Sequence, residues 1–415
     1  MRRVVFLSFV VVSGVLVWCT RDKTPLGPVE RAGLCPQQEI PWPSLANSPW
    51  PAPHGDMQCT GRARYPGPRE GRLEWVFQPT RERVFNAPVI GEDGTIYVLA
   101  DYHLYAVNPD GSLKWEFPTG YISLGSVVVG AGDIIYFAAG TSHREPGIWG
   151  YLWALDNKGN VLWEYKTSGM FEMFSPAIGL DGTIYLADSE GYLHAIDKTG
   201  RLRWKAWGDC GFYCRWWSSI AVSPEGTRLY LGGRDSTLCA VAAATGLLLW
   251  KVKVGWDVDW APLVDNEGNV YSYGLEEDRF ECYIVSVTPE GRLRWKCDIP
   301  EVKGIYFYGL DMHMDKGGNL YVCDWWRLYS IDCQGKLRWA VAYPDHDVFS
   351  PNTPILGDSQ GNVFLLMGSH YMYAFGGDGQ LLFECPTGGA SGVCGAISDR
   401  GRMYLTVGTR LLCIK

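Results

Sequence analysis

The sequence has no long block of like charge. Its 415 residues include 37 Lys and Arg against 45 Asp and Glu, a formal net charge of −8. Proteins that hold nucleic acid by its phosphates need a basic patch or stripe. The sequence contains none, so a nucleic-acid partner is excluded from the expected functions.

Metal-ligand clusters are also missing, and histidine is scarce. Cys210 and Cys214 have no two further ligands nearby, so we expect a disulfide or structural thiols there rather than zinc. The stretches 311–313 (DMH) and 345–347 (DHD) lack a recognisable third partner, and we expect them to lie in solvated loops. No catalytic residue, metal or cofactor is therefore predicted.

No apolar run is long enough to span a bilayer. Two arginines precede the apolar run 4–18, as in an export signal, and we expect residues 1–18 to direct the chain to the periplasm or cell envelope. Cys19 follows directly, as in a bacterial lipoprotein signal, but Trp18 is bulkier than the small residue usual there. A lipid anchor at Cys19, a signal cut elsewhere and an uncleaved anchor all stay open.

Prolines concentrate in residues 19–70. This stretch has no helical or strand period, and we interpret it as a Pro-rich extension or linker ahead of a main body at 71–415. Trp50 and Tyr65 stand among turn residues in its latter half. Since aromatic side chains tend to be buried, this half is expected to dock on the main body.

The main body is built on the unit at 178–207, IGLDGTIYLADSEGYLHAIDKTGRLRWKAW. Short β-branched and aromatic runs alternate with D-G and T-G turns, where glycine supplies the positive φ of a tight turn. The unit is predicted to be a four-stranded antiparallel meander.

Eight imperfect copies of this unit follow one another at spacings of 40 to 48 residues. Their outer-strand motif, G-x-L-x-W, is the clearest marker, and it ends at Trp75, Trp115, Trp163, Trp204, Trp250, Trp295, Trp339 and, in the last copy, Phe383. A period of this length with four strands per repeat is typical of a β-propeller.

The two ends of the main body complete each other. It begins with a fourth strand at 72–77 that has no preceding three, and it ends after a third strand at 411–414. We therefore predict an all-β, eight-bladed propeller of four-stranded antiparallel blades, closed by pairing of the N-terminal strand with the C-terminal blade.

Thirteen cysteines in a chain with an export signal suggest some disulfides. Cys282 and Cys297 flank a TPEG turn almost symmetrically. They are the best candidates to face each other across one hairpin, and we predict a disulfide between them.

The long, dissimilar connections should all lie on one face, opposite the tight turns, and variable loops on a repetitive scaffold commonly bind ligands. Trp, Tyr and Arg are also frequent at protein interfaces. Roughly half of the aromatic side chains in these loops should nevertheless only cover blade ends. The predicted binding residues are Trp207, Phe212, Tyr213, Arg215, Trp216, Trp217, Trp256, Asp257, Asp259 and Trp260.

The repeats resemble the tryptophan-docking repeats of pyrroloquinoline-quinone-type propellers, A-x-D-x-x-T-G-x-x-x-W. Residues 240–250, AVAAATGLLLW, keep the length of that motif with Ala242 in place of its Asp. One branch, the quinoprotein dehydrogenases, carries a Cys-Cys disulfide and calcium ligands on longer chains, and no Cys-Cys dipeptide occurs here. The BamB-like lipoproteins of outer-membrane β-barrel assembly are more similar in length, export signal and compact blades.

This resemblance implies a non-catalytic envelope scaffold that binds a protein partner. The expected molecule is a monomeric propeller without a cofactor, attached to a membrane only through its signal segment or a lipid anchor. A quinone-dependent dehydrogenase and a carbohydrate-binding propeller remain as alternatives.

Overall fold

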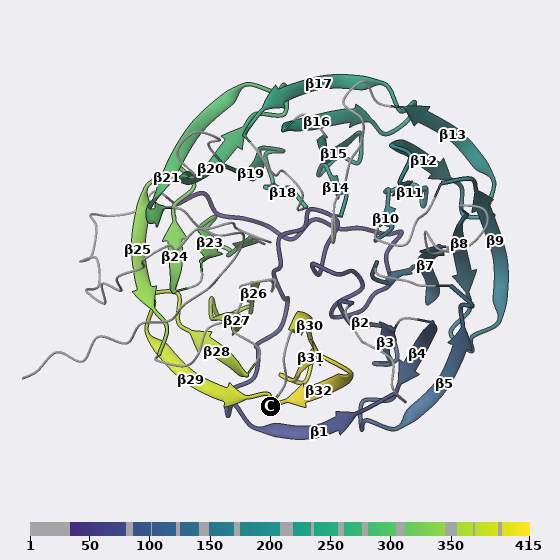
Figure 1. Cartoon of the computed structure of the whole chain (residues 1–415), viewed down its shortest axis with the longest axis horizontal. Coiled ribbons are helices and arrows are strands. Elements are labelled where there is room, and N and C mark those ends of the chain that lie inside the picture. Colours follow the sequence, from purple (N-terminus) through teal and green to yellow (C-terminus); the bar gives the residue numbers. More distant parts are fainter. Residues whose placement is uncertain are drawn as a thin grey trace, which may run out of the picture.

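A ring of eight four-stranded antiparallel sheets makes up a computed structural model of the chain (Figure 1). In seven sheets the strands pair in sequence order, from an inner strand beside the central channel to an outer strand at the rim, and in the eighth the outer strand is β1. The structure describes residues 34–79, 86–100, 102–121, 125–140, 149–169, 175–207, 219–233, 236–255, 261–275, 281–303, 312–324, 326–344, 355–367, 370–388 and 392–415.

Blades are numbered along the chain, and each contributes four strands from the channel outwards. Blade 1 consists of β2 (Val89–Ile90), β3 (Ile96–Leu99), β4 (His103–Val107) and β5 (Leu113–Pro118), and blade 2 of β6 (Val128–Gly130), β7 (Ile134–Gly140), β8 (Gly150–Leu155) and β9 (Val161–Thr167). Blade 3 consists of β10 (Ala177–Ile178), β11 (Ile184–Ala187), β12 (Tyr192–Ile196) and β13 (Leu202–Trp207), and blade 4 of β14 (Ala221–Val222), β15 (Arg228–Gly233), β16 (Thr237–Ala242) and β17 (Leu248–Lys253).

Blades 5 to 8 repeat the arrangement, and the last is composite. Blade 5 consists of β18 (Leu263–Val264), β19 (Val270–Leu275), β20 (Glu281–Val287) and β21 (Leu293–Lys303), and blade 6 of β22 (His313–Met314), β23 (Leu320–Cys323), β24 (Arg327–Ile331) and β25 (Leu337–Ala342). Blade 7 consists of β26 (Leu356–Gly357), β27 (Val363–Met367), β28 (Tyr371–Phe375) and β29 (Leu381–Pro386), and blade 8 of β30 (Gly392–Ile397), β31 (Met403–Val407), β32 (Arg410–Ile414) and β1 (Leu73–Phe77).

The composite blade confirms the predicted ring closure. Strand β1 pairs antiparallel with β32, and the Arg72 and Lys415 backbones exchange two hydrogen bonds at 3.2 and 3.0 Å. Glu74 of β1 also forms a bidentate ion pair with Arg402, 328 residues away. The first and last parts of the propeller are therefore held in one sheet by backbone and side-chain contacts.

Tryptophan docking joins one blade to the next. Each outer-strand indole N–H donates to a backbone carbonyl in the third-to-fourth-strand turn of the following blade, and the ring lies against a glycine of that turn. A Cβ atom at Gly200, for example, would lie 2.8 Å from the Trp163 ring. The donor–acceptor pairs are Trp75–Pro109 (3.1 Å), Trp115–Asn157 (3.0 Å), Trp163–Lys198 (2.9 Å), Trp204–Ala243 (3.1 Å), Trp250–Pro289 (2.7 Å), Trp295–Cys333 (3.0 Å) and Trp339–Gly377 (3.1 Å).

Phe383 replaces the tryptophan in blade 7 and keeps the same position. Its ring packs against Gly71, which precedes β1 and fills the glycine position of blade 8. Middle strands such as β3 and β11 are buried along their whole length, so both faces of a blade are covered by its neighbours. The aromatic residue of G-x-L-x-W therefore packs between neighbouring blades.

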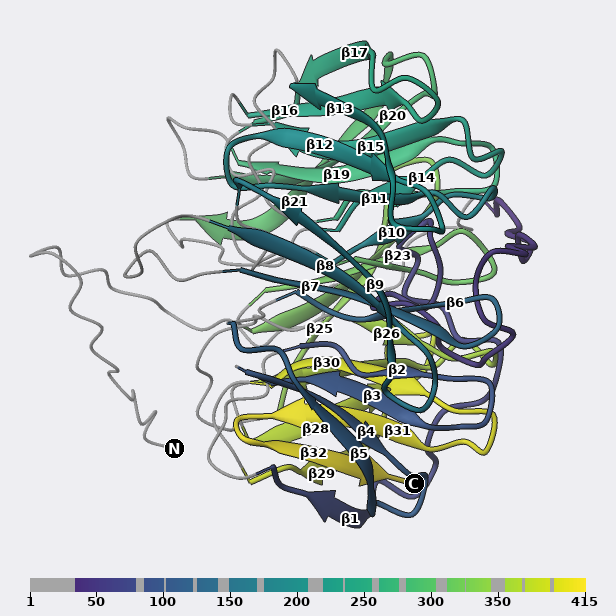
Figure 2. The ribbon, with the colours of Figure 1, turned by 90° about the vertical axis from the view of Figure 1, so that its right-hand side faces the viewer.

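The two ends of the barrel-shaped ring differ in their connections. Turns between first and second strands and between third and fourth strands lie on one end, which we call the turn face. Connections between second and third strands and between blades lie on the other end, the loop face. Figure 2 shows the purple N-terminal segment along the turn face.

Residues 34–70, which we call the strap, cross the turn-face end of the central channel (Figure 1). An inner strand is the edge of its sheet, so its outward N–H groups need partners. In seven blades the strap supplies a hydrogen-bond acceptor for the N–H of the second residue of the inner strand. The contacts are Ile90 N to Trp50 O (2.8 Å), Val129 N to Pro51 O (2.8 Å), Ile178 N to Met57 Sδ (3.1 Å), Val222 N to Met57 O (2.7 Å), Val264 N to Gln58 O (2.9 Å), Met314 N to Thr60 O (2.9 Å) and Gly357 N to Gly61 O (2.9 Å).

The strap is thus packed on the propeller rather than separate from it. Trp50 is fully buried, as its place in the sequence suggested, whereas Tyr65 is 38% exposed. Backbone groups make most of the strap's contacts with the inner strands. A sequence pattern of side chains therefore does not reveal them.

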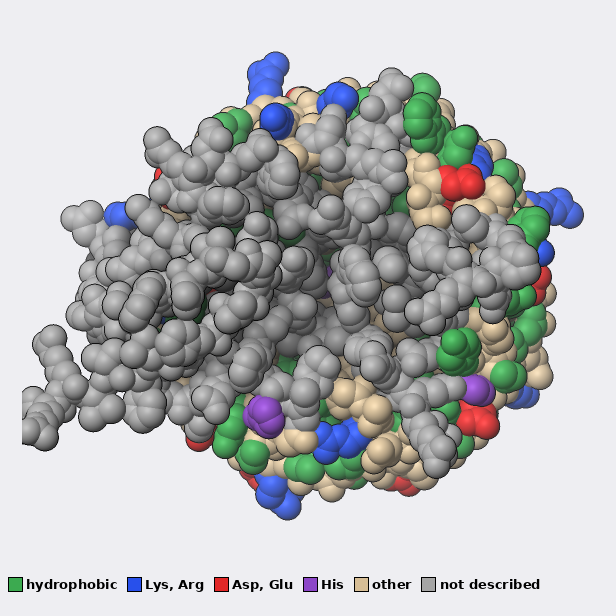
Figure 3. All heavy atoms as spheres, in the orientation of Figure 1, with side chains coloured by type: hydrophobic (Ala, Val, Ile, Leu, Met, Phe, Trp, Pro, Cys, Tyr) green, Lys and Arg blue, Asp and Glu red, His purple; other side chains and the backbone are tan. Residues whose placement is uncertain are grey.

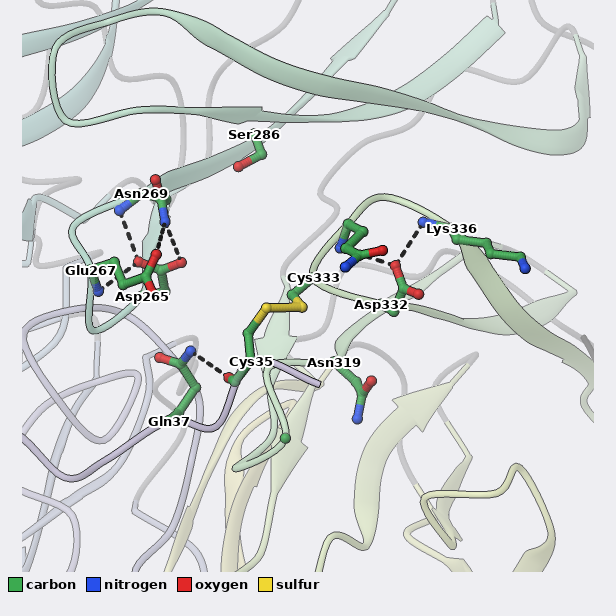
Figure 4. Close-up of a disulfide and its surroundings, with 12 residues drawn as sticks. Cys35, Gln37, Asp265, Glu267, Asn269, Ser286, Asn319, Asp332, Cys333 and Lys336 are labelled. Atoms are coloured by element: carbon green, nitrogen blue, oxygen red, sulfur yellow. Dashed lines mark hydrogen bonds between the residues drawn. A yellow bond between two sulfur atoms is a disulfide. The ribbon is translucent and has the colours of Figure 1, made fainter. Parts of the chain in front are cut away.

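One disulfide is present among the described cysteines, and it is not the predicted one. Cys35 of the strap is bonded to Cys333 in the β24–β25 turn of blade 6 (Figure 4). Cys282 and Cys297 instead carry buried free thiols. The hairpin register places Ile284, not Cys282, opposite Cys297, so the prediction of that pair was wrong by two residues.

Only strands and turns occur in the described part of the chain, which accordingly contains no helix able to cross a membrane.

Candidate functional site

The predicted binding cluster is described at one position, Trp207. The other nine predicted residues lie outside the described part of the chain, as do Cys19, Cys210 and Cys214. Trp207 is the last residue of β13, on the loop face, and 63% of it is exposed. We therefore built the candidate site outward from Trp207, using the described residues of blades 2 and 3.

Trp207 is paired with Tyr192 across the β12–β13 ladder. Their ring centroids are 6.5 Å apart, and the Lys205 Nζ lies 3.9 Å above the centre of the Tyr192 ring. A cation held over an aromatic face combines apolar area with a positive charge. This end of blade 3 can therefore contact both apolar and acidic groups of a ligand.

Below this pair, a buried polar network crosses the seam between blades 2 and 3. His194 lies 2.8 Å from an Asp188 oxygen through Nε2 and 3.0 Å from the Tyr165 hydroxyl through Nδ1. Asp188 and His194 are both fully buried, and Lys205 Nζ approaches Asp188 at 3.5 Å. Both ring nitrogens of His194 are thus occupied within the protein.

The electrostatics of this network favour a neutral histidine beside a charged aspartate. Burial would raise the pKa of Asp188, but hydrogen bonds from His194 and the Tyr192 amide outweigh it and lower the pKa overall. Burial lowers the pKa of His194, against the opposing hydrogen bond to Asp188. The neutral His194 then donates a hydrogen bond from Nε2 to Asp188 and accepts one at Nδ1 from the Tyr165 hydroxyl. No nitrogen of the ring is left for acid–base catalysis. We interpret the network as a structural link between blades.

Blade 2 carries an aromatic ladder that the sequence prediction missed. Tyr121 and Tyr151 stack at 4.5 Å with an interplanar angle of 10°, and Tyr151 stacks on Trp153 at 5.3 Å. Trp149, at the loop-face end of β8, is 40% exposed, with Lys166 Nζ 4.0 Å above its ring. The run W-G-Y-L-W at 149–153 was an available signal, but four of its five residues lie in β8 rather than in a long loop.

The same lysine-over-aromatic arrangement thus recurs in adjacent blades at the loop face. Lys166 covers Trp149 in blade 2, and Lys205 covers Tyr192 in blade 3. A third example, Lys296 over Tyr283 at 3.8 Å, lies in blade 5. Figure 3 views this face and shows apolar side chains, in green, among charged ones along its rim. We call the blade 2 and blade 3 groups together the aromatic rim.

The other polar candidates do not form a site. Within the described ranges, no group of three or more His, Cys, Asp or Glu side chains could hold a metal ion. His313 was expected in a solvated loop, and this was wrong, because it is fully buried in β22 with Nδ1 2.9 Å from the Thr60 carbonyl oxygen. Asp311 and the stretch 345–347 lie outside the described residues.

Comparison with protein families gives one match. A family model described as the outer membrane protein assembly factor BamB matches residues 67–207 and 189–279, which together span half of the chain. Among curated protein sequences, none is similar enough to this chain to count as a relative.

Solved structures share the fold at low sequence identity. BamB from Moraxella catarrhalis is 14% identical, with a TM-score of 0.60 over 82% of this chain and 98% of that one. A quinohemoprotein alcohol dehydrogenase from Comamonas testosteroni is 16% identical, with a TM-score of 0.65 over 88% and 80%. A europium-containing methanol dehydrogenase is 13% identical, with a TM-score of 0.65 over 87% and 90%. Shape alone therefore does not separate a binding protein from an enzyme.

Proposed function

Because the chain belongs to the family of the outer membrane protein assembly factor BamB, we propose that it is a non-catalytic scaffold of the cell envelope. Its partner would be a protein component of outer-membrane protein assembly. Export by residues 1–18, and a lipid anchor at Cys19, are parts of this proposal.

The aromatic rim is the observation that carries the proposal. Trp149 and Trp207 are large, exposed rings on the loop face of adjacent blades. Lys166 lies over Trp149, and Trp207 packs beside Tyr192, over which Lys205 lies. Exposed tryptophans surrounded by polar groups are typical of protein interfaces. The nine predicted loop residues from Phe212 to Trp260 would extend this surface. The His194–Asp188 pair beneath it supports binding rather than catalysis, since its hydrogen-bonding groups are satisfied internally.

Site-specific photocrosslinking in cells tests the proposal. A photoreactive amino acid is placed at Trp149 or Trp207, and at Leu293 as a control, since Leu293 is 59% exposed but lies on the outer strand near the turn face. We expect a crosslink to an outer-membrane assembly component from positions 149 and 207 and none from 293. Equal crosslinking from all three positions, or none from the first two, would contradict a loop-face scaffold.

Affinity measurements give an independent check with the same partner. Truncation of an interface tryptophan to alanine commonly costs about 2 kcal/mol or more, which is roughly thirty-fold in affinity. We expect Trp149→Ala and Trp207→Ala to show such losses. The control Leu293→Ala should bind like the unaltered protein.

A quinone-dependent dehydrogenase is the second candidate, because two of the similar structures are alcohol or methanol dehydrogenases. The sequence lacks the adjacent cysteine pair of the enzymes it resembles. The test is purification with pyrroloquinoline quinone and calcium, followed by an artificial-dye assay with alcohols and sugars. Dye reduction that depends on the quinone would replace the scaffold proposal with an enzymatic one.

A carbohydrate ligand is the third candidate, because exposed aromatic rings also stack on sugars. A glycan array with the unaltered protein, Trp149→Ala and Trp207→Ala distinguishes it. Binding to a glycan that both variants lose would favour a sugar over a protein partner.

A further inference from the structure

The strap has two parts that differ in how they are held. Residues 42–65, which we call the plug, fill the turn-face end of the channel. Residues 34–41, which we call the latch segment, run outside it from Cys333 towards the plug.

The plug is held by burial as well as by hydrogen bonds. Trp50 is fully buried, Met57 is 4% exposed and Trp42 is 7% exposed. The seven inner-strand amides donate to this part of the strap, and the Trp42 indole donates to the Ile178 carbonyl at 2.8 Å. Apolar burial is the largest stabilising contribution to such contacts, so the plug does not need the disulfide to stay in place.

The latch segment has few buried contacts. Leu34 is 71% exposed, and Ile40 is the hydrophobic side chain of this segment that packs, partly buried, on the core. Its backbone bonds run from Cys35 N to Gly317 O at 3.0 Å and from Gln37 N to Lys316 O at 2.8 Å.

Two more hydrogen bonds come from blade 5. The Asn266 amide N–H donates to the Gln37 side chain at 2.9 Å, and the Asn266 side chain donates to the Gln38 carbonyl at 3.0 Å. Hydrogen bonds near solvent contribute little net stability, while fixing an extended segment costs conformational entropy for every residue. From the plug, Arg62 donates to the Gln38 carbonyl at 3.2 Å and Arg64 pairs with Glu39 at 2.6 Å, but these contacts are exposed and add little stability. These polar contacts alone therefore do not hold the latch segment firmly.

The disulfide changes this balance because it joins the latch segment covalently to blade 6. The strap continues directly into β1 at its other end, so both ends are covalently joined to the ring (Figures 1 and 4). Once the disulfide is broken, the strap is joined to the ring covalently only through β1. Opening would then affect the latch segment and stop where burial begins, at Trp42.

We propose that Cys35–Cys333 is a redox latch on the turn face. A dithiol reductant gives two electrons and two protons to the disulfide and itself becomes a disulfide, and Cys35 and Cys333 become thiols. The latch segment then leaves the turn face and uncovers Asn266 and residues 316–318. The plug stays in the channel.

The remaining described thiols are poor competitors in this exchange. Cys59, Cys239, Cys282, Cys297, Cys323, Cys385 and Cys413 are all buried. Burial raises the pKa of Cys282 and of Cys413 to about 12 and that of Cys297 to about 11. A thiol attacks as its thiolate, so these groups react slowly, whereas Cys35 is partly exposed at the surface.

Hydrogen–deuterium exchange with mass spectrometry tests the latch. The full chain is compared before and after incubation with dithiothreitol. We expect peptides from the latch segment to exchange about ten-fold faster or more after reduction, because local opening controls their exchange. Peptides covering residues 54–63 should change by less than about two-fold, since the plug remains in place. An unchanged latch segment, or equal loss of protection in both regions, would overturn the proposal.

Cys333→Ser supplies the matched control. Without reductant its latch segment should exchange as fast as in the reduced protein, and dithiothreitol should have no further effect on either region. A response of this variant to dithiothreitol would assign the change to other cysteines and overturn the latch. Should the variant fail to fold, Cys35→Ser provides the same comparison, and the reduced unaltered chain gives the result without any substitution. The outcome is independent of whether the loop face binds a partner.

Discussion

Trp75 donates its indole N–H to the carbonyl oxygen of Pro109 at 3.1 Å, and this bond joins blade 8 to blade 1. The same ring lies 2.8 Å from where a Cβ atom would stand at Gly111. Trp75 belongs to β1, which pairs with β32 at the other end of the chain. One residue therefore takes part in the closing sheet and in the docking contact to the first blade.

Trp75→Ala should destabilise the whole propeller. Replacing this partly buried tryptophan with alanine removes apolar burial and the hydrogen bond to Pro109, which we expect to cost about 2–3 kcal/mol. We expect a loss of this size in the free energy of unfolding, measured by chemical denaturation. Trp207→Ala, whose ring is 63% exposed, should change stability by less than about 0.5 kcal/mol. Similar effects of the two substitutions would show that docking does not close the ring.

The Glu74–Arg402 ion pair should make stability depend on pH in acid. The hydrogen bond from Arg402 lowers the pKa of Glu74 from 4.5 to about 2. As the pH falls, the Glu74 carboxylate is protonated in the unfolded chain before it is protonated in the folded protein. The contribution of the ion pair to folding stability is therefore complete above pH 4.5 and is lost as the pH falls towards 2. Because both side chains are 29% exposed, solvent screening limits it to about 1 kcal/mol.

Denaturation curves of the unaltered protein and Glu74→Gln check this dependence. The variant should be less stable at pH 6 and should lose less stability between pH 4.5 and 2. Parallel pH profiles for the two proteins would rule out the ion pair as the source.

The repeat made the propeller fold predictable from the sequence, whereas the contacts of the strap with the inner strands were not predictable. Eight copies of G-x-L-x-W, with a fourth strand first and a third strand last, leave ring closure as the arrangement that completes every sheet. Most hydrogen bonds between the strap and the inner strands join backbone groups, which leave no periodic side-chain pattern. Cys35 and Cys333 are 298 residues apart, and sequence alone cannot select such a pair from thirteen cysteines. A disulfide across one hairpin, such as Cys282–Cys297, is easier to propose, but a register offset of two residues was enough to make that prediction wrong.

The glycine beneath each docked ring should tolerate no side chain. Gly200 has φ +85°, and a Cβ atom there would lie 2.8 Å from Trp163. Gly182, in the same blade, has a similar φ of +80° with nothing within 4 Å of such an atom. Both alanine variants carry the backbone strain of about 1 kcal/mol, but only Gly200→Ala also displaces the ring. We expect Gly200→Ala to unfold at lower denaturant concentration than Gly182→Ala, by about 1–3 kcal/mol. Equal midpoints would mean that the ring does not rest tightly on the turn.

His313 should give the propeller a second pH dependence, at higher pH than Glu74. Burial lowers its pKa to about 4, although nearby Asp315 and Asp358 oppose the shift and Arg62 adds to it. Its Nδ1 faces the Thr60 carbonyl oxygen of the plug, and its buried Nε2 has no hydrogen-bond partner among the described residues. Protonation of Nε2 would bury an N–H without an acceptor, so the folded protein disfavours the charged form of His313. The unfolded chain, in contrast, binds the proton near pH 6.5. This contribution to stability is complete above pH 6.5 and should fall by about 3 kcal/mol towards pH 4. His313→Asn should be less stable at pH 7 but should lose this slope, and a variant that retains it would assign the dependence to another group.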